Sequence, residues 1–262
     1  MLKKYLTFLI SIVFLTSCAS QQSGPEKKTV LLVSAAVSLK DSLNEIKEQF
    51  EEENPSIEVR YNFSSTGALK RQIEQGAPVD VFFSASKDLF EQLGKKGLLN
   101  ESLQMDCLGN SLVLITSKEN ETLKMQDLAS GDIGKIAIGT PETVPAGKYA
   151  KEALVHDDLW ERNKDRIVYA KDVRQVLSYV ETGNVHAGIV YKTDAATSEK
   201  VNQTPIEPAS YESIIYPAGV LEETEHEREA EVFFRFLQKE QSIKVFEQQG
   251  FKVLHKGDRD VE

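Results

Sequence analysis

Residues 30–41, VLLVSAAVSLKD, combine a short apolar run, a turn of small residues and the first turn of a helix. Val30–Val33 has the length and composition of a buried β-strand. Ser38 and Asp41 fit the S-x-x-D capping box, which predicts that Ser38 caps the N-terminus of a helix with apolar residues up to Phe50. A strand followed at once by a helix is the basic unit of α/β folds.

The same alternation continues along the chain. Short apolar or alternating runs predict strands at 57–63, 79–83, 111–116, 136–138, 167–169, 187–191 and 214–216. Helical periodicity predicts helices at 64–76, 87–96, 146–154, 172–180, 225–238 and 242–248. This order predicts α/β lobes with mainly parallel sheets, whose ligands bind where strands end and helices begin.

Four of these strand-to-helix junctions contain small, hydroxyl-bearing or capping residues. They are Ala35-Ala36-Val37-Ser38, Phe63-Ser64-Ser65-Thr66-Gly67, Val144-Pro145-Ala146-Gly147 and Lys171-Asp172-Val173. A helix N-terminus attracts anions because it has free N–H groups and a partial positive charge. For any single junction taken alone, plain helix capping is the commoner explanation. The four together favour a cleft that binds an oxyanion through neutral donors.

Length, charge and cysteine content exclude some classes of function but do not select one. A length of 262 residues suits one large domain or two lobes, and a net charge of −10 argues against non-specific binding to nucleic acid. Cys18 and Cys107 are too few for a disulfide framework, and no Cys/His cluster suggests zinc. An enzyme, a small-molecule binding protein and an interaction module remain open.

The N-terminus has the features of a secretory leader. Lys3 and Lys4 precede an apolar run at 5–15, which is shorter than the ~20 residues of a membrane-spanning helix. The run ends in LTSC at 15–18, which resembles the lipobox of bacterial lipoproteins, with Cys18 as the lipidated residue. An ordinary leader with a chance cysteine is the alternative. We expect a leader at 1–17, a flexible tether at 18–28 and an extracytoplasmic protein anchored to the cell membrane.

Further segments share their order and spacing with a known family. They are 34–39 (SAAVSL), 76–82 (GAPVDVF), 108–113 (LGNSLV), 144–154 (VPAGKYAKEAL), and 172–177 (DVRQVL) followed by 188–195 (GIVYKTDA). In these segments the chain resembles the molybdate-binding proteins of ABC molybdate importers, and the resemblance runs from about residue 29 to residue 254. Each segment alone could arise by chance, whereas all of them in order are specific.

This resemblance implies a two-lobe fold of the type II periplasmic-binding-protein kind, with the ligand in the cleft between α/β lobes. One lobe would contain residues 29–108 and 217–254, the other residues 109–216, and 255–262 would be a polar tail. The chain would cross between the lobes twice.

The resemblance also implies which residues hold the anion. Hydroxyl donors fall on Ser38, Thr66 and Tyr191, and main-chain donors fall on Ala146 and Val173. Ser65 takes the place of Thr66 if that loop shifts by one residue. The molybdenum would be bound only within its oxyanion, with no direct ligand from the protein, and no cofactor is implied.

These residue types suit a fully deprotonated oxyanion. Molybdate at neutral pH is a dianion without a proton to donate, so a carboxylate in the site would repel it. Phosphate keeps a proton near pH 7 and gains from an acidic acceptor. The nearest carboxylate is Asp172, which we expect to be an N-cap or first-turn residue facing solvent. Tungstate, nearly the size of molybdate, is expected to bind as well.

Other functions stay open at this point. An extracytoplasmic hydrolase is disfavoured, because the sequence lacks a G-x-S-x-G elbow and its four histidines lie outside the junctions. We expect Asp80 to be a structural residue and Cys107 a buried apolar one. A binding protein for sulfate, another oxyanion or a small organic anion remains possible, since one fold serves many solutes. An interaction module without a ligand would lack the cleft donors.

The partners follow from the resemblance. We expect a monomer that is not an enzyme and does not bind nucleic acid. It would carry molybdate or tungstate to a membrane permease driven by a cytoplasmic ATPase, and would be held at the membrane by the lipid on Cys18.

Overall fold

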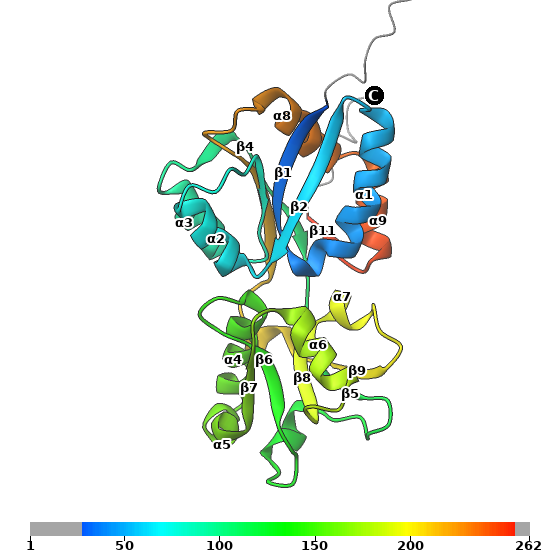
Figure 1. Cartoon of the computed structure of the whole chain (residues 1–262). Helices are drawn as coiled ribbons and strands as arrows, with labels where there is room; N and C mark the ends of the chain where they lie inside the picture. Colours follow the sequence, from blue (N-terminus) through cyan, green and yellow to red (C-terminus); the bar gives the residue numbers. More distant parts are fainter. Residues whose placement is uncertain (1–27, 255–262) are drawn as a thin grey trace, which may run out of the picture.

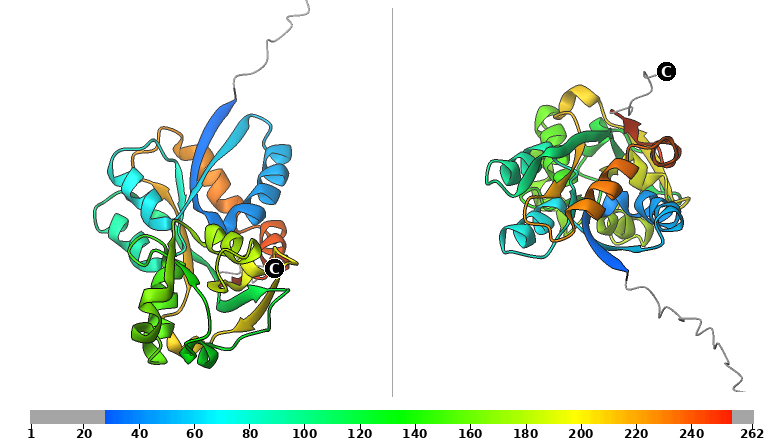
Figure 2. Two further views of the ribbon diagram at one scale, coloured as in Figure 1. Left: turned by 60° about the horizontal axis from the view of Figure 1, so that its bottom comes forward. Right: turned by 90° about the horizontal axis from the view of Figure 1, so that it is seen from above.

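Two β-sheets, each in its own lobe, organise residues 28–254, which are the part of the chain described by the computed structural model (Figure 1). The predicted leader at 1–17, Cys18 with most of the tether and the tail at 255–262 lie outside the described residues. Viewed from above, one lobe covers the other (Figure 2). Between residues 28 and 254, no helix has the length and apolar character needed to cross a membrane.

The first lobe has a six-stranded sheet, counted over the described residues. Its strands are β1 (Thr29–Ala36), β2 (Ile57–Ser64), β3 (Val81–Phe83), β4 (Leu99–Gly109), β10 (Ile215–Leu221) and β11 (Lys252–Val253). Their order across the sheet is β11-β4-β10-β3-β1-β2. Strand β1 is parallel to β2 and β3, whereas β10 is antiparallel to β3 and β4.

Helices cover both faces of this sheet (Figures 1 and 2). They are α1 (Lys40–Glu53), α2 (Thr66–Glu74), α3 (Lys87–Gly94), α8 (Glu227–Phe236) and α9 (Glu240–Gln248). Successive side chains of a strand point to opposite faces, so Phe82 packs in one apolar cluster with α2 and α3. Its neighbours Val81 and Phe83 belong to the other cluster, which includes Phe50 of α1 and Phe233 of α8.

The second lobe repeats this plan with a five-stranded sheet in the described chain, ordered β7-β6-β8-β5-β9. Its strands are β5 (Leu112–Ser117), β6 (Ile136–Gly139), β7 (Ile167–Ala170), β8 (Ala187–Tyr191) and β9 (Val201–Pro205). Its helices are α4 (Pro145–His156), α5 (Trp160–Asn163), α6 (Val173–Glu181) and α7 (Lys192–Ala195), with 3-10 turns η2 (Met125–Ala129), η3 (Lys164–Arg166) and η4 (Pro208–Ser210).

The two-lobe α/β fold is confirmed, but the sheets are mixed rather than mainly parallel. The chain passes from β4 to β5 and returns from β9 to β10 (Figure 1). These connecting strands run antiparallel to their neighbours β3, β8 and β11. Parallel pairing remains where each lobe has strand–helix–strand units, in β1 with β2 and in β6 with β7. Strand β4 ends at Gly109 and β10 begins at Ile215, beside the predicted lobe boundaries.

Candidate functional site

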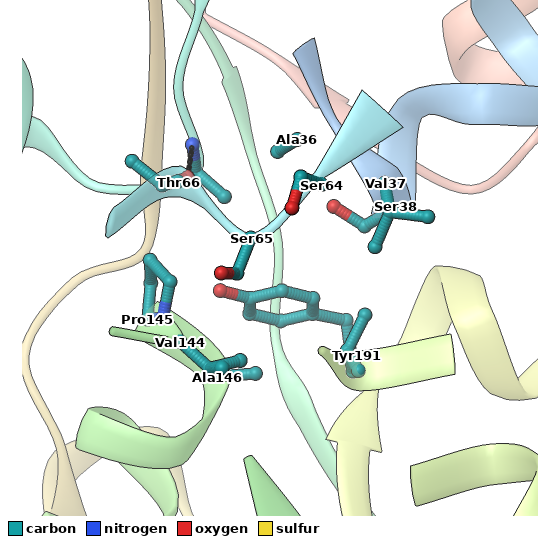
Figure 3. Close-up of a pocket in the computed structure, with 12 residues that line it drawn as sticks. Ala36, Val37, Ser38, Ser64, Ser65, Thr66, Val144, Pro145, Ala146 and Tyr191 are labelled. Carbon is teal, nitrogen blue, oxygen red and sulfur yellow. Dashed lines mark hydrogen bonds between the residues drawn. The ribbon is translucent and has the colours of Figure 1, made fainter. Parts of the chain in front are cut away.

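A small pocket lies between the two lobes, with about 10 Å³ of free volume, roughly the room of one water molecule. It is lined by every residue that the sequence predicted as a ligand, together with Ser65. Its lining consists of Ala36, Val37, Ser38, Ser64, Ser65, Thr66 and Ala85 from the first lobe and Val144, Pro145, Ala146, Val173 and Tyr191 from the second (Figure 3).

Two helices of the second lobe begin at this pocket. Pro145 is the first residue of α4 and Ala146 the second, so the Ala146 N–H has no acceptor within the helix. Gly147 allows the first turn of α4 to lie close to β6, because a Cβ at Gly147 would collide with the backbone of Gly139. Val173 is the first residue of α6, and its N–H is likewise unpaired within the helix.

Asp172 is the N-cap of α6, as predicted. Its carboxylate accepts a hydrogen bond from the Gln175 N–H at 2.9 Å, and the residue is not part of the pocket lining. Among the described residues that line the pocket, none is charged. The pocket therefore presents hydroxyl and N–H groups to a ligand, and no carboxylate would repel an anion.

Ser38 does not cap the following helix, and the capping-box prediction is wrong. Ser38 lies in a 3-10 turn, η1 (Val37–Leu39), and α1 begins only at Lys40 without a side-chain cap. The Ser38 Oγ instead lies 3.1 Å from the hydroxyl of Tyr216 in β10. Asp41, the expected partner in the capping box, pairs with Arg174 of the other lobe at 2.6 Å. The local pattern was overridden by contacts distant in sequence.

The loop before α2 brings several hydroxyls to the pocket. Ser65 is the N-cap of α2 but makes no capping hydrogen bond, and its hydroxyl points into the pocket (Figure 3). The Thr66 Oγ1 accepts the Ala85 N–H at 3.0 Å, which leaves its own proton to donate. Ser64 also lines the pocket, although it was not predicted as a ligand. Its position at the end of a strand is the signal that could have identified it.

Tyr191 closes the pocket on the side of the second lobe. The residue is 2 % exposed, and its hydroxyl has no hydrogen-bond partner among the described residues. Burial raises the pKa of this phenol well above its ordinary value, so the hydroxyl keeps its proton at neutral pH. Figure 3 shows the Tyr191 and Ser65 hydroxyls directed into the same space. A buried hydroxyl without a partner is uncommon, and this one is free to donate to a group that enters the pocket.

Contacts between the lobes surround the pocket. The Gly67 N–H of α2 donates to the Thr143 carbonyl at 3.0 Å. The guanidinium of Arg174 in α6 bonds Asp41 at 2.6 Å. A third contact joins Lys148 of α4 to Asp88 of α3 at 2.9 Å. The lobes are thus closed over the pocket.

Residues 28–254 contain no group of three His, Cys, Asp or Glu side chains placed to hold a metal ion. Asp80 is structural, as predicted, because it accepts hydrogen bonds from the Leu32 N–H and the Thr224 hydroxyl. Cys107 is buried, as predicted, and burial raises the pKa of its thiol.

Similarity to known proteins agrees with this geometry. The family model of bacterial extracellular solute-binding proteins matches residues 31–252. A Bacillus subtilis (strain 168) protein, YvgL, whose provisional name describes an ABC transporter substrate-binding lipoprotein, is 45 % identical over 96 % of this chain and 99 % of its own length.

Two molybdate-binding proteins are also similar. That of Haemophilus influenzae, ModA, is 32 % identical over 95 % of this chain and 99 % of its own length. The solved structure of the periplasmic molybdate-binding protein of Azotobacter vinelandii is 25 % identical, covers 86 % of this chain and 100 % of its own, and has a TM-score of 0.79. The chain therefore belongs to the family of bacterial extracellular solute-binding proteins.

Proposed function

We propose that this protein binds molybdate in the pocket between its lobes and delivers it to the permease of an ABC transporter. The observation that carries the proposal is the lining of the pocket, in which hydroxyls and helix N-termini occur without any charged side chain. Such a site offers hydrogen-bond donors to each oxygen of an anion that has no proton of its own. The molybdate-binding relatives agree with this ligand.

Five residues are proposed to hold the anion. Ser38, Thr66 and Tyr191 would donate from their hydroxyls, and Ala146 and Val173 from their main-chain N–H groups. Ser65 is a further donor, because its hydroxyl points into the pocket without a capping bond. Each hydrogen bond to a charged group contributes roughly 1.5–3 kcal/mol, so several of them could support tight binding without an ion pair. Tungstate, with the same charge and shape, is proposed as a second ligand.

The cellular setting is part of the proposal. Cys18 would carry the lipid that holds the protein at the outer face of the cell membrane, which the LTSC sequence and the name of the Bacillus subtilis relative support. The protein would act as a monomer, and the energy for transport would come from the ATPase of the permease. No catalytic step is required of this chain.

Thermal unfolding in the presence of molybdate, tungstate, sulfate or phosphate tests the ligand. A ligand at 1,000 times its Kd stabilises the native state by about 4 kcal/mol, which raises the Tm of a protein of this size by about 8–16 °C. We expect this rise with molybdate and tungstate and little change with phosphate. A rise with sulfate alone would replace molybdate by sulfate as the ligand. No rise with any of the four anions would refute oxyanion binding.

A further inference from the structure

A chain of hydrogen bonds runs behind the pocket and ends at Ser38. Asn110 follows β4 in the first connection between the lobes, and Tyr216 lies in β10, just after the second. The Asn110 Nδ2 donates to the Tyr216 hydroxyl at 3.2 Å, and this hydroxyl lies 3.1 Å from the Ser38 Oγ. The Tyr216 side chain is fully buried and Ser38 is 4 % exposed, so water does not compete for these bonds.

The orientation of the Asn110 amide is fixed by its other contacts. Its Oδ1 accepts the backbone N–H of Ser111 at 2.9 Å, and a backbone N–H can only donate. Its Nδ2 therefore faces Tyr216 and also donates to the Thr193 Oγ1 at 2.9 Å. The amide nitrogen has no lone pair to offer, so the Tyr216 oxygen must act as the acceptor of this bond.

The direction of the next bond follows from this. The Tyr216 phenol has one proton, and burial keeps it in place by raising the pKa of the group. In the described part of the chain, the hydrogen-bond partners of this hydroxyl are Asn110 and Ser38, whereas the nearby Tyr191 hydroxyl interacts with it but makes no hydrogen bond. If Tyr216 did not donate to Ser38, a buried donor would be left unpaired, which is costly. The Ser38 oxygen is thus the acceptor, and its own proton is left for the pocket.

We propose that Asn110 and Tyr216 are positioning residues that hold Ser38 as a hydrogen-bond donor toward the pocket, and that this makes the site selective for oxyanions without a proton. A serine free to rotate could accept a hydrogen bond from hydrogen phosphate as readily as it donates one to molybdate. A serine whose oxygen already accepts from Tyr216 offers the ligand its proton. This inference rests on the proposed function.

Two substitutions test the direction of the chain. Tyr216→Phe keeps the buried ring and removes the hydroxyl, so Ser38 can turn. Asn110→Asp replaces the donor by a carboxylate oxygen, which would accept from Tyr216 and reverse every bond up to Ser38. Tyr211→Phe is the matched control, because the Tyr211 hydroxyl accepts the Leu112 N–H in the second lobe and does not line the pocket.

The measurement is calorimetric titration of the purified wild-type and variant proteins at pH 7 with molybdate, and displacement of bound molybdate by sulfate and by phosphate. Sulfate has the shape of phosphate but carries no proton at this pH. We expect Tyr216→Phe to weaken molybdate and sulfate binding a few-fold, because only a fraction of the freed Ser38 hydroxyls would be oriented to donate, without weakening phosphate binding. Asn110→Asp should lower the ratio of sulfate to phosphate affinity at least as far, and Tyr211→Phe should leave it unchanged.

Equal weakening of all three anions in both variants, or no change in their ratios, would overturn the inference and leave the proposed function standing. That result would mean that the two residues only support the fold. Failure of the wild-type protein to bind molybdate in the same titration would instead refute the proposed function. Asn110→Asp reverses the hydrogen bonds and Tyr216→Phe removes one hydroxyl, so each variant tests the inference independently. If one variant does not fold, the other still gives a result.

Discussion

Replacing Gly67 by alanine should prevent the lobes from closing fully over the pocket. Gly67 lies in the first turn of α2, where its N–H donates to the Thr143 carbonyl of the other lobe at 3.0 Å. A Cβ at this position would lie 2.7 Å from the Thr143 oxygen and 2.8 Å from the Thr143 Cα. Both atoms belong to the backbone, so no side chain can turn aside to make room.

The size of the effect follows from these distances. A separation of 2.7 Å is about 0.7 Å short of the 3.4 Å at which ordinary contact begins. A shift of the lobes by that amount stretches the bond from Gly67 to Thr143 beyond hydrogen-bonding range, which costs about 0.5–1.5 kcal/mol. It also weakens the nearby pair of Arg174 and Asp41 and loosens the donors on the ligand. Together we expect a loss of about 1.5–3 kcal/mol, or roughly 10- to 150-fold in affinity for molybdate.

Calorimetric titration with molybdate measures this loss. Gly131→Ala is the matched control, because no atom lies within 4 Å of a Cβ at that glycine and its backbone is not left-handed. Thermal unfolding without ligand should show the Gly67 variant to be as stable as wild type, since the collision exists only between closed lobes. A Gly67→Ala protein that binds molybdate as tightly as wild type would refute the reasoning that ligand binding requires this closed contact.

Three further predictions concern single side chains. Tyr191→Phe removes a buried hydroxyl without a partner, so the ligand-free protein should be equally or more stable in thermal unfolding. Calorimetry should show about 10- to 100-fold weaker molybdate binding. A loss of unfolding free energy beyond about 1 kcal/mol would contradict this. Asp41→Asn breaks its partly exposed ion pair with Arg174 across the lobes, so molybdate affinity should fall a few-fold at low salt with unchanged thermal stability, whereas an unchanged affinity would count against closure by this pair. Asp194 is fully buried beside Arg174, and burial raises its pKa from 3.8 to about 6. The folded protein therefore holds this proton more tightly than the unfolded chain does, and the resulting stability is lost as the pH rises from about 4 to about 6. Urea unfolding at both pH values should show this loss in wild type relative to Asp194→Asn, and equal pH dependence of the two proteins would exclude it.

The parts of the site that sequence predicts are those fixed by local rules. The first residues of a helix have free N–H groups wherever the helix lies, so the junctions at Pro145 and Asp172 predict free donors, and the family resemblance selects Ala146 and Val173 among them. The alternation of strands and helices likewise predicts that such N-termini gather where strands end. The structure places both helix starts at the pocket.

Features that depend on contacts between residues far apart in the chain cannot be predicted from short sequence patterns. Ser38 fits a local capping rule, but its partner Tyr216 is 178 residues away and no short pattern joins them. The Gly67 contact with Thr143 likewise exists only once both lobes are folded and closed. The first of these bonds is set by packing within the first lobe, and the second by the packing of one lobe on the other.

Strand β4 was not predicted, although a signal for it exists. Leu103, Met105 and Cys107 alternate with polar residues, as in a strand with one buried face. Without this strand, which runs antiparallel to β10, the sheets were expected to be mainly parallel. The strand begins with the polar residues Asn100 and Glu101, which are half-buried and exposed, so the alternating pattern covers only its second half.

A crystal structure of the protein with tungstate tests the central claim most directly, because the anomalous signal of tungsten locates the anion without assumption. We predict one tungstate ion between closed lobes, with its oxygens about 2.7–3.2 Å from the main-chain nitrogens of Ala146 and Val173 and from the hydroxyls of Ser38 and Tyr191. An ion bound elsewhere, or one held by a lysine or arginine side chain in place of these donors, would contradict the account.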